Sequence, residues 1–262
     1  MVGIERGARR RADFMYMAPP FIAYYAADQG NETLLRESVA QCAKYRAVLR
    51  SDSGLWQHIV GPQNRDRGLW STGNGWAAAG MARVLAAVVK APAREDEDTS
   101  WRQEGIDKLT AWTMEILDGA LASSLDHGLV RNYMDQEESH GFGEISGSAL
   151  LGSVVYRMAV LQPQSCGERY IKWADGVRTV LGGMDGEGGA HVTDEGIVRP
   201  AVNPLGWLDP RPYTAGSPEG QAFVVLMYSA WRDCVLQGLC RKEQAVRRHE
   251  SRTRGNVIYR TK

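Results

Sequence analysis

The chain has 262 residues, of which 44% are hydrophobic and 24% are charged, enough for one large soluble domain or two small ones. The formal net charge is zero, so no global field favours nucleic acid or a membrane surface as a partner. No apolar run approaches the length of a membrane span, and no signal peptide follows the basic N-terminus. The compartment is therefore left unknown: cytoplasmic by default, secreted if the natural N-terminus is missing.

Seven helical segments follow one another along the chain, and they alternate between two kinds. Four are almost wholly apolar and are expected at 14–27, 75–89, 147–161 and 220–231. Three are amphipathic and are expected at 32–49, 101–121 and 168–181. Because helices that are apolar on all sides are buried and striped helices cover them, the alternation predicts helical hairpins in an inner and an outer layer.

The apolar segments recur at a spacing of roughly 60 to 73 residues, and a loop precedes each of them. We expect the loops at 50–76, 124–146 and 183–217 to gather on one rim of the array. No β-branched apolar runs alternate with the helices, so a parallel α/β fold is excluded. Residues 1–240 are predicted to form one all-α toroid domain. Residues 241–262, with eight Lys or Arg against two Glu, are predicted to form a basic, solvated tail.

The four cysteines, Cys42, Cys166, Cys234 and Cys240, include no Cys-x-x-Cys pair. This spacing argues against a zinc site and leaves disulfides open. We expect no metal and no cofactor.

The loop at 54–76, GLWQHIVGPQNRDRGLWSTGNGW, is the most informative segment of the chain. It places Trp56, Trp70 and Trp76 around His58, between two helical segments. Tryptophans in a polar loop are typical of surfaces that stack on flat apolar faces, such as those of sugar rings. The alternative is that each tryptophan plugs the loop onto the core, and Trp76 fits that interpretation equally well.

Five motifs lie in order along most of residues 12–231: ADFMYMAPPFIAYYA (12–26), GLWQH (54–58), GLWSTGNGWAAAGMARVL (68–85), GEISGSA (143–149) and SPEGQAF (217–223). In these motifs the chain resembles the unsaturated glycuronyl hydrolases of glycoside hydrolase families 88 and 105, especially the unsaturated rhamnogalacturonyl hydrolases. The resemblance implies an (α/α)6 barrel, the six-hairpin glycosidase fold. Seven helices would make an incomplete toroid of this type.

The resemblance also implies a reaction. A terminal unsaturated uronic acid, left when polysaccharide lyases cut pectin-type glycans, is hydrated at its C4–C5 double bond. The hemiketal that results collapses and releases the next sugar. The expected partner is therefore an oligosaccharide, with neither nucleic acid nor membrane involved.

By the same resemblance, Asp13 stands at the position of the catalytic acid/base and His58 at that of an active-site histidine. The histidine is expected to hydrogen-bond the substrate or the attacking water. Trp70 and Trp76 match positions that stack on the sugar, and Trp56 lies beside them as a further candidate. From the residues alone, Asp13 can also be read as the N-cap of its helix.

The chain departs from the family in its loop chemistry. Thr72 occupies the place of an arginine suited to the substrate carboxylate, and Arg65 and Arg67 are the nearby cations that could replace it. Asn74, between two glycines, is expected to be a turn residue.

The chain is also shorter than its relatives, which carry further hairpins and a second aspartate before the motif that contains Asp13. We expect an N-terminally truncated toroid that is nearly inactive alone. It would expose Phe21, Tyr24 and Tyr25 and would self-associate through the open edge of the ring.

Two other functions stay open. One is an impaired or non-catalytic helical carbohydrate-binding module. The other is an inverting glycosidase, in which Glu144 or Glu219 would have to partner Asp13 across the scissile bond. Glu144 and Glu219 are instead expected to be residues at helix entries, where acidic groups are favoured.

Overall fold

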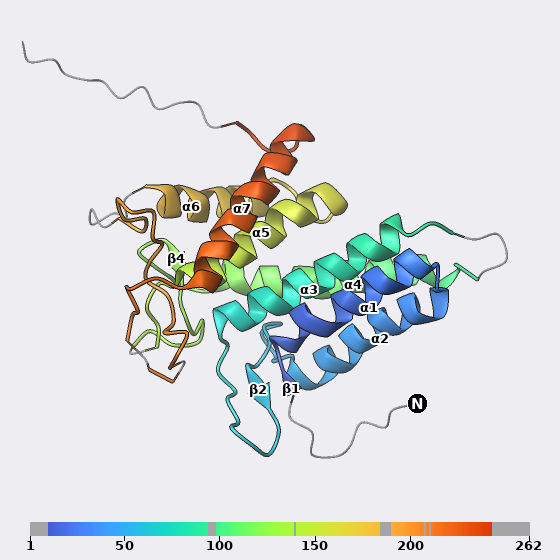
Figure 1. The fold of residues 1–262 in the computed structure, drawn as a ribbon, viewed down its shortest axis with the longest axis horizontal. Coiled ribbons are helices and arrows are strands. Elements are labelled where there is room, and N and C mark those ends of the chain that lie inside the picture. The colour runs from blue at the N-terminus through green and yellow to red at the C-terminus, as the bar shows by residue number, and fades with distance from the viewer. Residues whose placement is uncertain are drawn as a thin grey trace, which may run out of the picture.

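The computed structural model describes residues 10–93, 98–138, 140–183, 190–206, 208–209 and 211–242. All seven predicted helices are present in these residues (Figure 1). The predicted basic tail at 241–262 lies outside them, apart from its first two residues.

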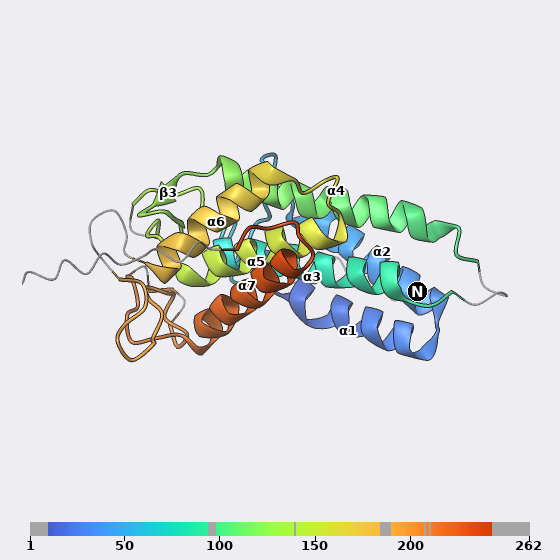
Figure 2. The same cartoon turned by 90° about the horizontal axis from the view of Figure 1, so that it is seen from above.

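The helices form two layers, as the alternation of apolar and striped segments predicted. The inner helices are α1 (Phe14–Gln29), α3 (Ser71–Lys90), α5 (Ile145–Leu161) and α7 (Pro218–Leu236), each packed against the next. The outer helices are α2 (Glu32–Leu49), α4 (Trp101–Ala122) and α6 (Glu168–Gly182). Figure 2 shows α4 and α6 on one side of α3 and α5, with α1 and α7 on the other.

Burial follows this arrangement. The central inner helices α3 and α5 are buried along most of their length, and their small residues let the neighbouring helices approach closely. The outer helix α6 buries only a stripe, Ala174, Val177, Arg178 and Leu181. The predicted inner position of residues 75–89 is therefore confirmed.

Helix α1 is an inner helix at the edge of the array, so it is buried on one side only. Met15, Ala23 and Ala26 pack inward, whereas Phe21 is 68% exposed and Tyr25 is 52% exposed. The expectation of an open apolar edge at this helix is met.

The strands form two short antiparallel pairs outside the helices. Strand β1 (Arg10–Arg11) pairs with β2 (Ile59–Val60), and β3 (Leu125–Asp126) pairs with β4 (Leu129–Val130). A single bridge between Trp70 and Tyr133 joins the first loop to the second. A backbone hydrogen bond of 3.0 Å from Ile145 N to Pro200 O attaches the third loop. The three loops thus meet on one rim, as predicted.

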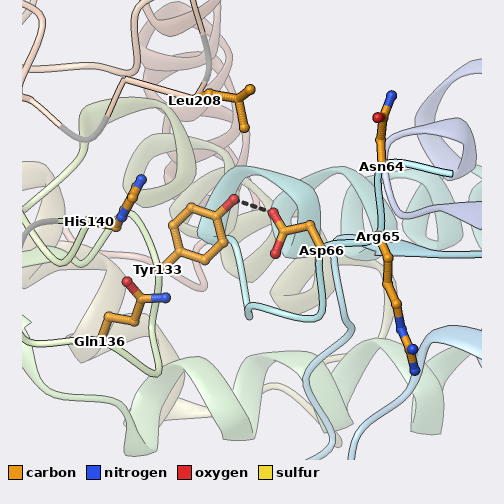
Figure 3. A pocket seen from close by; sticks show the side chains of 7 residues that line it. All are labelled: Asn64, Arg65, Asp66, Tyr133, Gln136, His140 and Leu208. Carbon is orange, nitrogen blue, oxygen red and sulfur yellow. Dashed lines mark hydrogen bonds between the residues drawn. The ribbon is translucent and has the colours of Figure 1, made fainter.

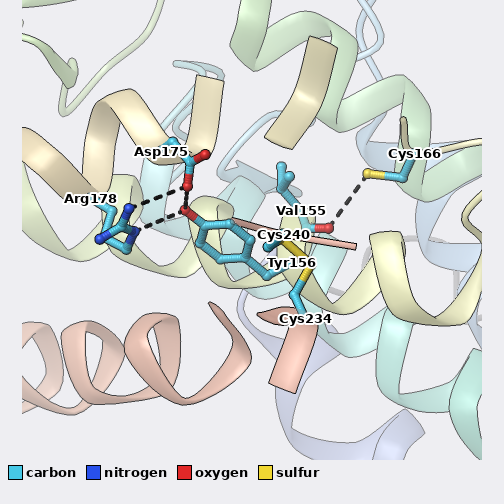
Figure 4. The surroundings of a disulfide bond; sticks show 7 residues. All are labelled: Val155, Tyr156, Cys166, Asp175, Arg178, Cys234 and Cys240. Carbon is cyan, nitrogen blue, oxygen red and sulfur yellow. Dashed lines mark hydrogen bonds and ion pairs between the residues drawn. A yellow bond between two sulfur atoms is a disulfide. The ribbon is translucent and has the colours of Figure 1, made fainter. Parts of the chain in front are cut away.

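The end of α7 carries a disulfide between Cys234 and Cys240, which the sequence had left open (Figure 4). Cys42 and Cys166 are buried free thiols, and burial raises the pKa of Cys166 to about 12. Both free thiols therefore act as small core residues. Among the helices that the structure describes, none is both long and apolar enough for a membrane span.

Candidate active site

Asp13 and His58, 45 positions apart in the chain, are brought together by the pairing of β1 with β2. The amide of Ala12 donates a 3.0 Å hydrogen bond to the carbonyl of His58, directly before the aspartate. The two residues predicted to be catalytic therefore share one corner of the rim, at the N-terminal end of α1.

Asp13 precedes α1 but does not cap it. Its side chain makes no capping hydrogen bond; it forms an ion pair with Arg11 at 3.0 Å and is 18% exposed. With Phe14, Met17 and Tyr45 the pair lines a small hollow of about 250 Å³. Asp13 therefore occupies the N-cap position of α1 without a capping hydrogen bond from its side chain, and the carboxyl group is reachable from solvent.

His58 belongs to a largely buried polar network with Asp66 and Tyr133. Only 2% of its surface is exposed, and its Nδ1 lies 2.9 Å from Oδ2 of Asp66. Burial alone would raise the pKa of Asp66, but hydrogen bonds from His58, Tyr133 and Gly68 outweigh it and lower that pKa below the usual 3.8. An ionised carboxylate only accepts, so Nδ1 of His58 donates and the tautomer is fixed.

Asp66 and Tyr133 also line the cavity of about 450 Å³ shown in Figure 3, where the Tyr133 hydroxyl donates to Asp66. All three rim loops contribute to it, the third through Leu208. Arg65 belongs to the lining, but its side chain points away from Tyr133 and Asp66 (Figure 3). Asp13 lies outside this cavity, in its own smaller hollow.

Trp56, expected to bind substrate, is a core residue. Its side chain is fully buried, and both its backbone groups are tied to Asn74: its amide donates to Asn74 Oδ1 at 2.7 Å, and its carbonyl accepts from Asn74 Nδ2 at 2.9 Å. The structure therefore corrects both expectations. Trp56 offers no face to a sugar, and Asn74 is a buried residue in the first turn of α3 instead of a turn residue in a loop.

Trp70 and Trp76 lie together at the start of α3 but differ in exposure. Trp70 is 9% exposed, packs against His58 with the ring planes tilted by 49° and the centroids 4.5 Å apart, and donates from Nε1 to Asn132 Oδ1 at 2.9 Å. Trp76 is half-buried and meets Trp70 edge-on at 5.4 Å. Little of Trp70 can contact a ligand directly, so it acts mainly as packing for His58.

Thr72 is buried in the first turn of α3, and its hydroxyl donates to Oε2 of Glu144 at 3.2 Å. Glu144 in turn caps α5 by accepting from the amide of Gly147 at 2.7 Å, so its expected role at a helix entry is confirmed. The side chain of Thr72 therefore connects the start of α3 to the start of α5. In the structure as described, Thr72 presents no surface for direct contact with substrate.

Glu219 lies in the first turn of α7, which is capped by Ser217 and not by the glutamate. Burial, and after it the negative charges of Glu144 and Asp13, raise the pKa of Glu219 to about 7. The carboxyl groups of Asp13, Glu144 and Glu219 therefore lie near enough to one another for the charges of the first two to act on the third. The described residues hold no cluster of three His, Cys, Asp or Glu side chains arranged for a metal ion.

Sequence reasoning missed Asp66 and Tyr133, the partners of His58. Asp66 lies in the tryptophan loop beside two arginines, and Tyr133 ends a short β-prone piece 67 positions further on. No local pattern links two such residues, because their contact exists only once two loops pair.

Comparison with known proteins agrees with this geometry. The family model for Glycosyl Hydrolase Family 88 matches residues 11–231. A search of curated proteins finds no match.

Among solved structures, a possible member of the GH105 family from Salmonella enterica matches with a TM-score of 0.69 at 16% identity, over 89% of this chain and 59% of that one. A family 88 glycosyl hydrolase from Bacteroides vulgatus matches with a TM-score of 0.65 at 16% identity, over 89% of this chain and 65% of that one. The unsaturated glucuronyl hydrolase from Bacillus sp. GL1, described as responsible for glycosaminoglycan degradation, matches with a TM-score of 0.61 at 19% identity. The match covers 91% of this chain and 61% of that one.

At these identities the solved structures show the fold, the helical toroid of six-hairpin glycosidases, and the chain spans less than two thirds of each of them. The family model covers most of the chain, including both residues predicted to be catalytic and all seven inner and outer helices in whole or in large part. On that match, the protein belongs to glycosyl hydrolase family 88.

Proposed function

We propose that this protein is a glycoside hydrolase that acts on oligosaccharides ending in an unsaturated uronic acid, by adding water across the C4–C5 double bond. The observation that carries the proposal is the juxtaposition of Asp13 and His58 on the rim of a family 88 toroid. Asp13 is partly exposed, as a carboxyl group that exchanges protons with a substrate must be, and Asp66 holds His58 in one orientation beside it.

In the proposed reaction, Asp13 exchanges the protons. A proton is delivered to C4, the oxygen of a water molecule bonds to C5, and the proton that this water loses returns to the carboxylate. The C4–C5 π electrons form the new C4–H bond. The hemiketal then opens and releases the next sugar, so the net change is the addition of one water. His58, oriented by Asp66 and only 2% exposed, is the residue proposed to hydrogen-bond the water or a sugar hydroxyl, which requires that group to reach the buried ring.

We propose pectin-type glycans as the source of the substrate, on the strength of the motif resemblance. The test is to mix the protein with an unsaturated galacturonyl-rhamnose disaccharide and with its saturated counterpart. Ultraviolet absorbance of the double bond should decay, and mass spectrometry should show one added water and free rhamnose. Cleavage of the saturated disaccharide, or persistence of the unsaturated one, would contradict the proposal.

The burial of Trp56 and Trp70 weighs against the second candidate, a non-catalytic module that binds sugars through its loop tryptophans. Stacking needs an accessible ring face, and Trp76 is the half-buried ring of the three. Binding of saturated oligosaccharides that is lost in Trp76→Ala, without any turnover of unsaturated ones, would favour the module.

We also propose that copies of this chain associate through α1. One helix carries four large apolar or aromatic side chains that are each about half exposed or more: Met17, Phe21, Tyr24 and Tyr25. Together they expose more apolar surface than single, scattered hydrophobic residues do. The double variant Phe21→Ser, Tyr25→Ser is expected to shift the protein from oligomer to monomer in sedimentation velocity. Leu205→Ser, a change at an exposed loop leucine, is the control and should leave the distribution unchanged. Identical sedimentation of all three proteins would exclude α1 as the interface.

A further inference from the structure

The first turns of all four inner helices meet at one level of the rim, and glycines make this meeting possible. A Cβ on Gly73 of α3 would lie 3.4 Å from the Cβ of Ala12, and one on Gly147 of α5 would lie 2.2 Å from Ser71 Oγ. On α7, a Cβ on Gly220 would lie 2.8 Å from Ser146 Oγ. Side chains at these turns are therefore held within reach of one another.

An aromatic layer lies one helical turn below. Phe223 of α7 meets the rings of Tyr16 and Trp76 edge-on, at 6.2 Å and 6.5 Å. On their helices these residues follow Glu219, Asp13 and Thr72 by three or four positions, so each pair shares one helix face. The apolar layer therefore forms the floor beneath the polar first turns.

The polar level carries carboxyl groups with unused hydrogen-bonding capacity. Glu144 is fully buried; Thr72 and Gly147 donate to its Oε2, Ser146 also bonds to its carboxyl group, and its Oε1 has no other hydrogen bond among the described residues. Oε1 of Glu219 is likewise buried without such a bond. A buried oxygen in this condition costs free energy unless something at the site bonds to it.

The charges around Glu219 determine which kind of sugar can bind beside it. The groups that act on Glu219 are the carboxyls of Glu144 and Asp13, while the first turn of α3 contributes hydroxyls and no charge. Arg11, a described cation beside Asp13, is held in an ion pair with that aspartate. Three ionised carboxylates would repel an anionic sugar, whereas a neutral carboxylic acid can donate a hydrogen bond to one.

We propose that Glu219 is a substrate-binding residue that works in its protonated form, donating its carboxylic proton as a hydrogen bond to the carboxylate of the terminal uronic acid. This inference rests on the proposed function, because it requires an acidic sugar at the rim. The proton stays on Glu219 throughout, and the acid/base exchange with the substrate belongs to Asp13. Glu219 thereby determines specificity for an acidic terminal residue.

The proposal fixes a pH dependence and its sign. With the pKa at about 7, Glu219 is protonated below neutrality and ionises above it. The Michaelis constant for the unsaturated disaccharide should therefore rise about tenfold for each pH unit above 7, since only the protonated fraction binds. In Glu219→Gln the amide donates without titrating, so the Michaelis constant should stay flat between about pH 6 and 9.

Three variants test this. Glu219→Gln should bind well at high pH, and Glu219→Ala should bind poorly at every pH. Glu168→Gln, which alters an exposed glutamate in the first turn of the outer helix α6, should keep the wild-type profile. A Glu219→Gln profile that rises like that of the wild type, or a wild-type profile that is flat, would overturn the inference and leave the proposed function standing.

A readout that needs no turnover completes the test. In protein labelled with ¹³C at glutamate carboxyls, the signal absent from Glu219→Gln should titrate with a midpoint near 7, and a midpoint near the ordinary 4.5 would overturn the inference. A wild type that titrates near 7 but consumes no unsaturated uronide at any pH would overturn the proposed function, and this binding role with it.

Discussion

Asp13→Asn is expected to lower kcat on an unsaturated uronide by roughly 10²–10⁴, the usual contribution of a positioned acid/base. An amide occupies the same volume but neither delivers a proton to C4 nor takes one from water. The fold should tolerate the change, because the residue does not cap α1 and its ion pair with Arg11 is partly exposed, a type of pair worth at most about 1 kcal/mol. The assay is the decay of ultraviolet absorbance under substrate saturation.

The matched control is Asp28→Asn, the same chemical change at an exposed position near the end of the same helix. It should turn over substrate like the wild type. Comparable turnover by Asp13→Asn and Asp28→Asn, with both variants folded by circular dichroism, would remove Asp13 from the mechanism. A joint loss of activity would instead point to the helix as a whole.

The layered helical architecture could be predicted from the sequence because it depends on local periodicity. The pattern of apolar residues within a helix predicts how much of that helix is buried. Segment 147–161 is apolar on every face and is buried along most of its length, whereas segment 168–181 is striped and is buried on one side. The gathering of the loops on one rim followed from their order along the chain. Membership of the glycosidase family followed from motifs spread over the same length.

The interior of the site could not be predicted in the same way, since it depends on contacts between loops. Gly-Asn-Gly is typical of a turn, yet here the glycines let the first turn of α3 pack closely, with Gly75 against Leu150, and Asn74 bridges back to Trp56. Tryptophans in a polar loop suggest exposure, but the loop folds over Trp56 and buries it. Tertiary contacts thus overrode the local signal.

The strongest prediction for the fold concerns Gly80, where α1 crosses α3. A Cβ at this position would lie 2.0 Å from the backbone carbonyl oxygen of Met15 and 2.6 Å from its carbon. Backbone atoms cannot rotate away as a side chain can, so Gly80→Ala must push α1 off α3. Overpacking of this kind costs roughly 1–3 kcal/mol of unfolding free energy, and more when the backbone must move.

Gly176 provides the opposite case. It is also a helical glycine, in the outer helix α6, but a Cβ there would meet nothing within 4 Å. Gly176→Ala should therefore raise the unfolding free energy by about 0.5–1 kcal/mol, because alanine loses less backbone entropy in a helix. Urea unfolding followed by circular dichroism should move the two midpoints in opposite directions from that of the wild type.

The displacement of α1 should also reach the active site, since Asp13 lies two residues before Met15 and is held beside His58 by the short β1–β2 pairing. Positioned catalysis is sensitive to shifts of about 1 Å, so the folded fraction of Gly80→Ala should turn over substrate well below the wild-type rate. Gly176→Ala should retain full activity. A Gly80→Ala protein with wild-type stability and turnover would mean that the contact between α1 and α3 does not fix the position of Asp13.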